Sequence, residues 1–122
     1  MIGIDLIKVS RMNHLIKRFG DKALQKFLNT DEIKLVKNYK TAAGFWAAKE
    51  ACSKALGVGI GAECNFHDIS ISKTIKGAPI LNLSDKLVSN FYITDTSLSI
   101  THDGDYAIAA VAIESSTTNK VK

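Results

Sequence analysis

Two periods of apolar and polar residues alternate along this chain, and they separate helices from strands. The clearest helical period lies in residues 42–56, where Ala, Leu, Glu and Lys dominate. The apolar positions there recur at spacings of three and four residues: Phe45, Ala48, Cys52 and Ala55. Thr41 is the predicted N-cap. Gly57 follows the last turn, where helices often end with a residue in the left-handed backbone conformation, which favours glycine. The pattern predicts one long central helix with an apolar stripe that packs against a sheet.

A strand pattern and a second helical pattern precede the central helix. Residues 1–7 contain four strand-forming aliphatic side chains, which predicts a buried strand. Ser10 is placed to cap a helix whose apolar residues share one face: Met12, Leu15, Ile16 and Phe19. Short helices are predicted over residues 22–28 and 31–38, the second capped by Thr30.

After the central helix the pattern changes to that of strands. Strands are predicted over residues 66–73, 80–83, 98–101 and 106–113. Pro79 suits the start of the second of these strands, and Ser84 is placed to cap a helix after it. The dipeptide Asp103-Gly104 predicts the turn of the last hairpin.

This order of elements is typical of an α+β domain. We expect a mainly antiparallel sheet packed on the long central helix, in a single domain over residues 1–114 followed by a polar tail over 115–122. The chain has no run of 18 apolar residues and no signal-peptide pattern, so we expect a cytoplasmic protein. Its two cysteines, Cys52 and Cys64, are expected to be reduced and structural.

Positive charge is concentrated in the first third of the chain. The net charge is +4, while residues 1–40 alone carry nine lysines and arginines against four acids. A local basic surface favours an anionic partner. One hypothesis is therefore a small basic nucleic-acid-binding module without catalysis. Against it, the aromatic residues are not interleaved with the basic ones, and no nucleic-acid motif is present.

Two acids and a lysine indicate a different chemistry. Glu50 and Lys54 lie one turn apart on the central helix, on a face where small alanines leave room for a ligand to approach. Such a pair alone is typical of an exposed ion pair that contributes ~0.3–0.5 kcal/mol. Asp5 lies in the middle of the first strand, where a buried carboxylate needs hydrogen-bond donors or a cation. A structural pairing with Arg11 and a functional role are both open for Asp5.

Three segments in a fixed order carry a resemblance to a known family. They are Gly3-Ile4-Asp5 with Arg11, then Trp46-Ala47-Ala48-Lys49-Glu50-Ala51 with Lys54, Gly57 and Gly59, and finally Ser99-Ile100-Thr101-His102-Asp103 with Tyr106 and Ala107. Together, from residue 1 to about residue 114, they resemble the 4′-phosphopantetheinyl transferase superfamily and, within it, the short bacterial class.

The resemblance implies an enzyme with a fold of the expected kind. Its reaction moves the 4′-phosphopantetheine group of coenzyme A onto a serine of apo acyl carrier protein and releases adenosine 3′,5′-bisphosphate. It implies Mg²⁺ held by Asp5 and Glu50, since this ion prefers oxygen ligands, and Lys54 directed at the phosphates. Either a metal-bound water or Glu50 accepts the serine proton, and the sequence leaves both open.

The resemblance also assigns the binding of the two substrates. Gly57, Gly59 and Gly61 follow Lys54 and are expected to cradle the pantetheine arm and its pyrophosphate. His102 is expected to bind a phosphate of coenzyme A. The cationic face of the first helix is expected to dock the acidic carrier protein through Arg11, Lys17 and Arg18.

The family also implies an assembly, and the chain departs from its pattern at one position. A homotrimer with active sites between subunits is implied, with neither nucleic acid nor membrane as a partner. Phe45 stands where the family usually has an arginine before the aromatic residue of the central motif. The cations considered as replacements for that arginine are Lys37, Lys40 and Lys49.

Overall fold

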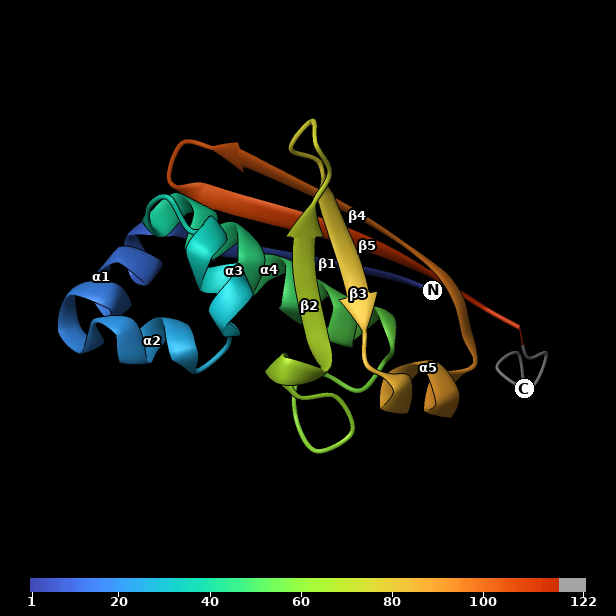
Figure 1. The fold of residues 1–122 in the computed structure, drawn as a ribbon. Coiled ribbons are helices and arrows are strands. Elements are labelled where there is room, and N and C mark those ends of the chain that lie inside the picture. Colours follow the sequence, from blue (N-terminus) through green and yellow to red (C-terminus); the bar gives the residue numbers. More distant parts are fainter. Residues whose placement is uncertain (117–122) are drawn as a thin grey trace.

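The computed structural model describes residues 1–116, and its elements follow the predicted order (Figure 1). They are β1 (Ile2–Lys8), α1 (Val9–Phe19), α2 (Asp21–Gln25), α3 (Thr30–Leu35), α4 (Tyr39–Ala55), a 3₁₀ turn (Phe66–Asp68), β2 (Ile69–Lys73), β3 (Pro79–Leu83), α5 (Asp85–Phe91), β4 (Ile93–Asp103) and β5 (Tyr106–Ser115). The α+β fold is confirmed.

The strands form two antiparallel units. The larger sheet has the order β1-β5-β4, with Asp5 opposite Ala109 and Ala109 opposite Ile100. The smaller unit is the β2–β3 hairpin. Figure 1 shows α4 and this hairpin on the same side of the larger sheet. One face of the sheet is therefore covered by the chain itself.

Helix α4 packs across β1, β5 and the end of β4. Its predicted apolar stripe is confirmed, because Phe45, Ala48 and Cys52 are buried and Ala55 nearly so. Ala43 and Ala47, the small residues in line with Glu50, are also completely buried. The expected room for a ligand along that line is therefore wrong, because the packing of α4 fills it.

The caps of two helices differ from those predicted. Helix α4 begins before Thr41, and Asn38 is its N-cap, accepting hydrogen bonds from the amides of Lys40 and Thr41. Helix α3 begins at Thr30, and the side chain of Asn29 caps it. In both cases asparagine, whose short side chain reaches the free amides of the first turn, takes the place of a nearby threonine.

Ser10 does not cap α1. Its amide and its hydroxyl both donate to the carboxylate of Asp105, at 2.9 and 2.6 Å, so the turn between β4 and β5 supplies the acceptor. This carboxylate satisfies an amide of the first turn from a distant part of the chain. Ser84 caps α5 as predicted, by accepting from the amide of Leu87.

The expectation that the first strand is buried holds for one of its faces only. Gly3 and Ile7 face α4 and are buried, whereas the opposite face of β1 is open. The exposed fractions there are 80% for Ile2, 62% for Ile4 and 55% for Leu6. No described element of the chain covers these side chains, so the sheet presents an apolar outer face.

An ion pair is completely buried beside α4. The Lys49 ammonium donates to Glu32 Oε1 at 2.9 Å and to the carbonyl oxygens of Phe27 and Phe66 at 2.7 and 3.1 Å. The other oxygen of Glu32 accepts from the amide of Ile71 at 2.9 Å. Every proton of the ammonium has an acceptor, so this pair ties α3, α4 and β2 together.

Both cysteines are free and buried, as expected for structural thiols. Burial raises the pKa of Cys52 to about 12 and that of Cys64 to about 11. Among residues 1–116, none of the helices combines the length and apolar character needed to cross a membrane. The expected polar tail falls mostly on residues 117–122, outside the described part, although the amide of Ser116 donates to the carbonyl of Tyr92.

Candidate active site

Asp5 and Lys54 meet where β1 crosses the C-terminal half of α4. The Lys54 ammonium lies 2.8 Å from Asp5 Oδ1 and 3.4 Å from the carbonyl oxygen of Ile4. Asp5 is largely shielded, whereas about half of the Lys54 side chain remains exposed. The hydrogen bond to Asp5 raises the pKa of Lys54, so its ammonium stays charged at neutral pH. Asp5 thus pairs with Lys54, not with Arg11.

Glu50 belongs to the same group of charges. Burial and then the nearby charge of Asp5 raise the pKa of Glu50, while Lys54 and Arg11 oppose this rise. The geometry agrees, because Glu50 lies one turn before Lys54 in α4, and Lys54 contacts Asp5 at 2.8 Å. The structure therefore brings together Asp5, Glu50 and Lys54, which are distant in sequence, and adds Arg11 to their surroundings.

Two neighbouring carboxylates are a donor set that fits a hard divalent cation. Within residues 1–116, His, Cys, Asp and Glu side chains form no group of three that would enclose a metal. Mg²⁺ does not need such a cage, because it usually takes one or two carboxylates and completes its octahedron with phosphate oxygens and water. The repulsion that raises the pKa of Glu50 is relieved by a bound cation.

The glycine amides of the loop after α4 are used within the loop and at the end of α4 and are not offered to a ligand. The amides of Gly57, Gly59 and Gly61 donate to the carbonyls of Lys54, Ser53 and Cys64, at 2.9, 3.2 and 2.9 Å. Gly57 and Gly59 have positive φ, and a Cβ on any of the three would meet no atom within 4 Å. The loop therefore contributes open space next to Lys54.

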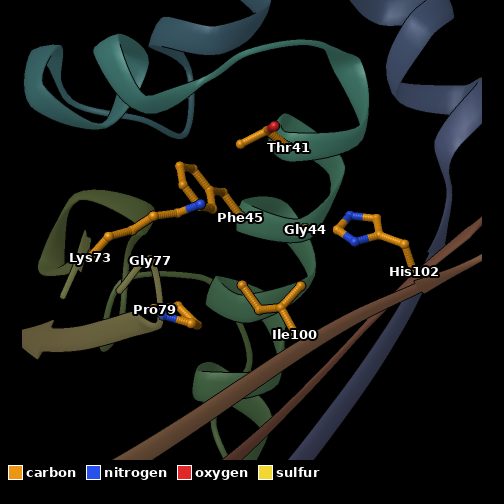
Figure 2. Close-up of a pocket in the computed structure, with 8 residues that line it drawn as sticks. All are labelled: Thr41, Gly44, Phe45, Lys73, Gly77, Pro79, Ile100 and His102. Atoms are coloured by element: carbon orange, nitrogen blue, oxygen red, sulfur yellow. The ribbon is translucent and has the colours of Figure 1, made fainter. Parts of the chain in front are cut away.

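His102 lies on the opposite edge of the larger sheet from Asp5, because β5 separates β4 from β1. Its Nε2 is 2.9 Å from the carbonyl oxygen of Lys40, and since a carbonyl can only accept, this nitrogen carries a proton. His102 lines a pocket with a volume of about 180 Å³ between α4, β4 and the β2–β3 turn (Figure 2). The pocket is lined by Thr41, Gly44, Phe45, Lys73, Gly77, Pro79, Ile100 and His102.

Lys73 supplies the cation of this pocket. Its Nζ lies 5.9 Å from the centre of the Phe45 ring, and Figure 2 shows its side chain extending toward that ring. The cation thus lies against Phe45, the position at which the resemblance implies an arginine. Lys49, considered for this role from the sequence, is excluded because its ammonium is buried with Glu32. Lys73 lies in a different part of the sequence, so no local pattern indicated it.

A hollow lies beside the cationic face of α1. It has a volume of about 390 Å³ and is lined by Arg11, Leu15, Phe19, Lys22, Ala23, Lys26, Phe27 and Trp46. Lys17 and Arg18 lie on the same helix and are exposed. The expected docking surface therefore combines positive charge with an apolar depression, and the charge of Arg11 also acts on the pKa of Glu50, which it lowers.

Comparison with known proteins gives the family. The model of the 4′-phosphopantetheinyl transferase superfamily matches residues 1–111, so the chain belongs to that superfamily of enzymes. The holo-[acyl-carrier-protein] synthase of Sulfurimonas denitrificans is 67% identical over 121 residues, which cover 99% of this chain and 100% of the relative. That of Nautilia profundicola is 56% identical and covers 93% of this chain and 98% of its own length. The chain is thus a 4′-phosphopantetheinyl transferase of the short bacterial class that the three segments resemble.

Solved structures of related enzymes agree with this assignment to the superfamily. The Helicobacter pylori holo-[acyl-carrier-protein] synthase in complex with coenzyme A superimposes with a TM-score of 0.91 at 48% identity, covering 93% of this chain and 100% of that one. The Bacillus anthracis enzyme, in complex with CoA (3′,5′-ADP), gives a TM-score of 0.79 at 36% identity, covering 94% and 96%.

Proposed function

We propose that this chain transfers the 4′-phosphopantetheine group of coenzyme A to a serine of apo acyl carrier protein in the presence of Mg²⁺. The products are the holo carrier protein and adenosine 3′,5′-bisphosphate. The observation that carries the proposal is the meeting of Asp5, Glu50 and Lys54 at one place. The names of the relatives and the coenzyme A complex of the Helicobacter pylori enzyme support the two substrates.

The charges at β1 and α4 suit the binding of a pyrophosphate. Asp5 and Glu50 would hold Mg²⁺, which when bound neutralises the anionic phosphates and favours attack on phosphorus. Lys54 keeps its charge and its side chain is about half exposed, so it would contact phosphate oxygens and stabilise the charge that grows on the leaving group. The open space at the glycine loop admits the pantetheine arm beside Lys54.

A mass measurement tests this function. The protein is incubated with apo acyl carrier protein, coenzyme A and Mg²⁺, and the carrier is analysed by mass spectrometry. We expect the mass of the carrier to increase by one phosphopantetheine group, and the increase to disappear when the acceptor serine of the carrier is replaced by alanine. A carrier of unchanged mass after incubation with the wild-type enzyme would contradict the proposal.

We assign the pocket of His102 and Lys73 to the other phosphate of coenzyme A, the 3′-phosphate of its ribose. The pocket pairs apolar Phe45 and Ile100, suited to a base, with the Lys73 ammonium, suited to a phosphate. His102, whose Nε2–H donates to the carbonyl of Lys40, would donate to the phosphate only through a protonated Nδ1. Lys73 thereby supplies to the phosphate the positive charge that the uncharged side chain of Phe45 lacks.

Replacing Lys73 by methionine should raise the KM for coenzyme A about tenfold, since a hydrogen bond to a charged group contributes ~1.5–3 kcal/mol. The KM for 3′-dephospho-coenzyme A should change less than twofold. Steady-state kinetics with both substrates measures the difference. Lys76→Met, which removes the same charge outside the pocket lining, is the control. An equal loss for both substrates would reject the assignment.

We further propose that the acidic carrier protein docks on α1 through Arg11, Lys17 and Arg18. Complementary charge speeds encounter and fixes the register of the two proteins. The hollow beside Arg11 offers an apolar side chain of the carrier a place between the lysines. Arg11 lines the hollow and its charge also acts on Glu50, so we expect a carrier bound there to present its serine toward the acids of the site.

The substitution Arg18→Glu should raise the KM for the carrier protein about tenfold and leave that for coenzyme A nearly unchanged, because it reverses a rim charge of the docking face. Arg18 is preferred to Arg11, whose charge also acts on Glu50. Initial rates at varied carrier concentration measure the effect. Lys34→Glu on α3, where the lysine side chain is 74% exposed, makes the same charge change elsewhere and should leave both constants unaltered.

Finally, we propose that three copies of the chain associate in the cytoplasm, with each active site between neighbouring subunits. Two features support this assembly. The outer face of β1 exposes Ile2, Ile4 and Leu6, a patch of the kind that is normally covered by a partner. Asp5 and His102 also lie on opposite edges of the sheet, so a site shared by two copies joins one edge of each.

A further inference from the structure

Gly3 lies under α4 with no space for a side chain. A Cβ at this position would be 1.9 Å from the carbonyl oxygen of Ala51 and 2.5 Å from the amide nitrogen of Ala55. Both are backbone atoms of a helix and cannot turn aside as the end of a side chain can. Gly3 is not among the residues with positive φ, so close approach, and not backbone conformation, requires the glycine here.

This close approach occurs beside the charged residues of the site. Ala51 and Ala55 directly follow Glu50 and Lys54 in α4. Gly3 precedes Asp5 by two residues and therefore lies on the same face of β1. The spacing between strand and helix at Gly3 thus determines how far the carboxylate of Asp5 lies from the functional groups of Glu50 and Lys54.

We propose that Gly3 is a positioning residue, which sets the separation between Asp5 on β1 and both Glu50 and Lys54 on α4. The inference rests on the function proposed above and adds a residue that acts through its neighbours. Ordinary contact at 3.4 Å in place of 1.9 Å requires a local separation of about 1.5 Å. The 2.8 Å bond between Lys54 and Asp5 does not survive such a movement without rearrangement.

Two carboxylates that share Mg²⁺ tolerate little displacement, because its ligands lie at ~2.0–2.1 Å in a nearly regular octahedron. A misplacement of about 1 Å commonly reduces a rate by ~10²-fold. Of the other glycines, only Gly44 has neighbours within 4 Å of an added Cβ, and these are the side chains of Ile100 and His102 at 3.0 and 3.3 Å. A methyl group that meets the backbone of α4 is therefore specific to the position of Gly3.

The test compares Gly3→Ala with Leu87→Ala, a substitution in the core at α5 that is expected to lower the midpoint of thermal unfolding. Both variants are assayed well below their midpoints of thermal unfolding. Mn²⁺ binding is measured by electron paramagnetic resonance with coenzyme A and without carrier protein. We expect Gly3→Ala to lose about 10²-fold in kcat and about tenfold in Mn²⁺ affinity, and Leu87→Ala to change neither by more than twofold.

Three results would overturn the proposal: unchanged Mn²⁺ affinity and kcat in Gly3→Ala, equal losses in Leu87→Ala, or a Gly3→Ala chain that does not fold. The two readouts also separate this inference from the proposed function. If the wild-type protein binds Mn²⁺ and Gly3→Ala weakens that binding, but no carrier is modified, the proposed reaction fails while the positioning role stands.

Discussion

The variants Asp5→Asn and Glu50→Gln should each lose about 10²–10³-fold in kcat while remaining folded. Each removes one negative charge and almost no volume, so the donor set for Mg²⁺ is reduced and the packing is kept. Losses of ~2.7–4 kcal/mol are typical when one preorganised electrostatic contact to a transition state is removed. The carrier-modification assay, followed by mass spectrometry over a range of Mg²⁺ concentrations, measures the effect.

Stability should hardly change in Asp5→Asn. The ion pair that it removes involves Lys54, whose side chain is 52% exposed, and such pairs contribute ~0–1 kcal/mol. Asp31→Asn, which removes an exposed carboxylate near Lys34, is the matched control and should keep full activity. Undiminished transfer by Asp5→Asn and Glu50→Gln would refute the proposed site, and a similar loss in Asp31→Asn would attribute the effect to net charge.

Lys49→Met should have the largest effect on stability, about 3–5 kcal/mol in the free energy of unfolding. The substitution leaves Glu32 charged and buried without its partner, and it leaves the carbonyl of Phe27 without a donor. Breaking a buried ion pair by removing one partner typically has a cost of this size. Burial lowers the pKa of Lys49, and the hydrogen bond and the charge of Glu32 oppose that shift.

Urea denaturation followed by circular dichroism gives this free energy. Lys54→Met is the matched control, because it makes the same substitution on the same helix at a half-exposed position and should cost no more than ~1 kcal/mol. In the double variant Lys49→Met with Glu32→Gln, part of the loss should be recovered, since no uncompensated charge remains. If Lys49→Met is no less stable than Lys54→Met, the buried pair does not have the importance that its contacts indicate.

The fold could be predicted from the sequence because its main elements have strong local signals. Three- and four-residue periodicity identifies α4, and alternation with turn residues identifies both hairpins. The prediction for β1 was incomplete because a strand of aliphatic residues reads as buried on both faces, whereas only the face with Gly3 and Ile7 is covered by this chain. The sequence of one chain does not record whether another copy covers the other face.

Some residues of the candidate site could be predicted from local motifs, whereas others depend on partners that are distant in sequence. Asp5, Glu50 and Lys54 were recognised from their motifs, and the structure brings them together. Lys49 was wrongly considered as a replacement for the arginine, and Lys73 was not predicted at all, because their partners lie far away in sequence. A lysine on a helix looks exposed until Glu32 is found beside it, and nothing local relates the end of β2 to Phe45.

The buried cysteines allow the opening of the interior to be compared among these variants without an added label. Thiol reagents react with the thiolate, and both Cys52 and Cys64 are kept protonated and away from solvent in the folded chain. Their modification by an aromatic disulfide reagent must therefore wait for the interior to open. The rate at which the reagent releases its coloured thiolate then reports how often that opening occurs in each variant, in the same buffer and at the same temperature as the assays.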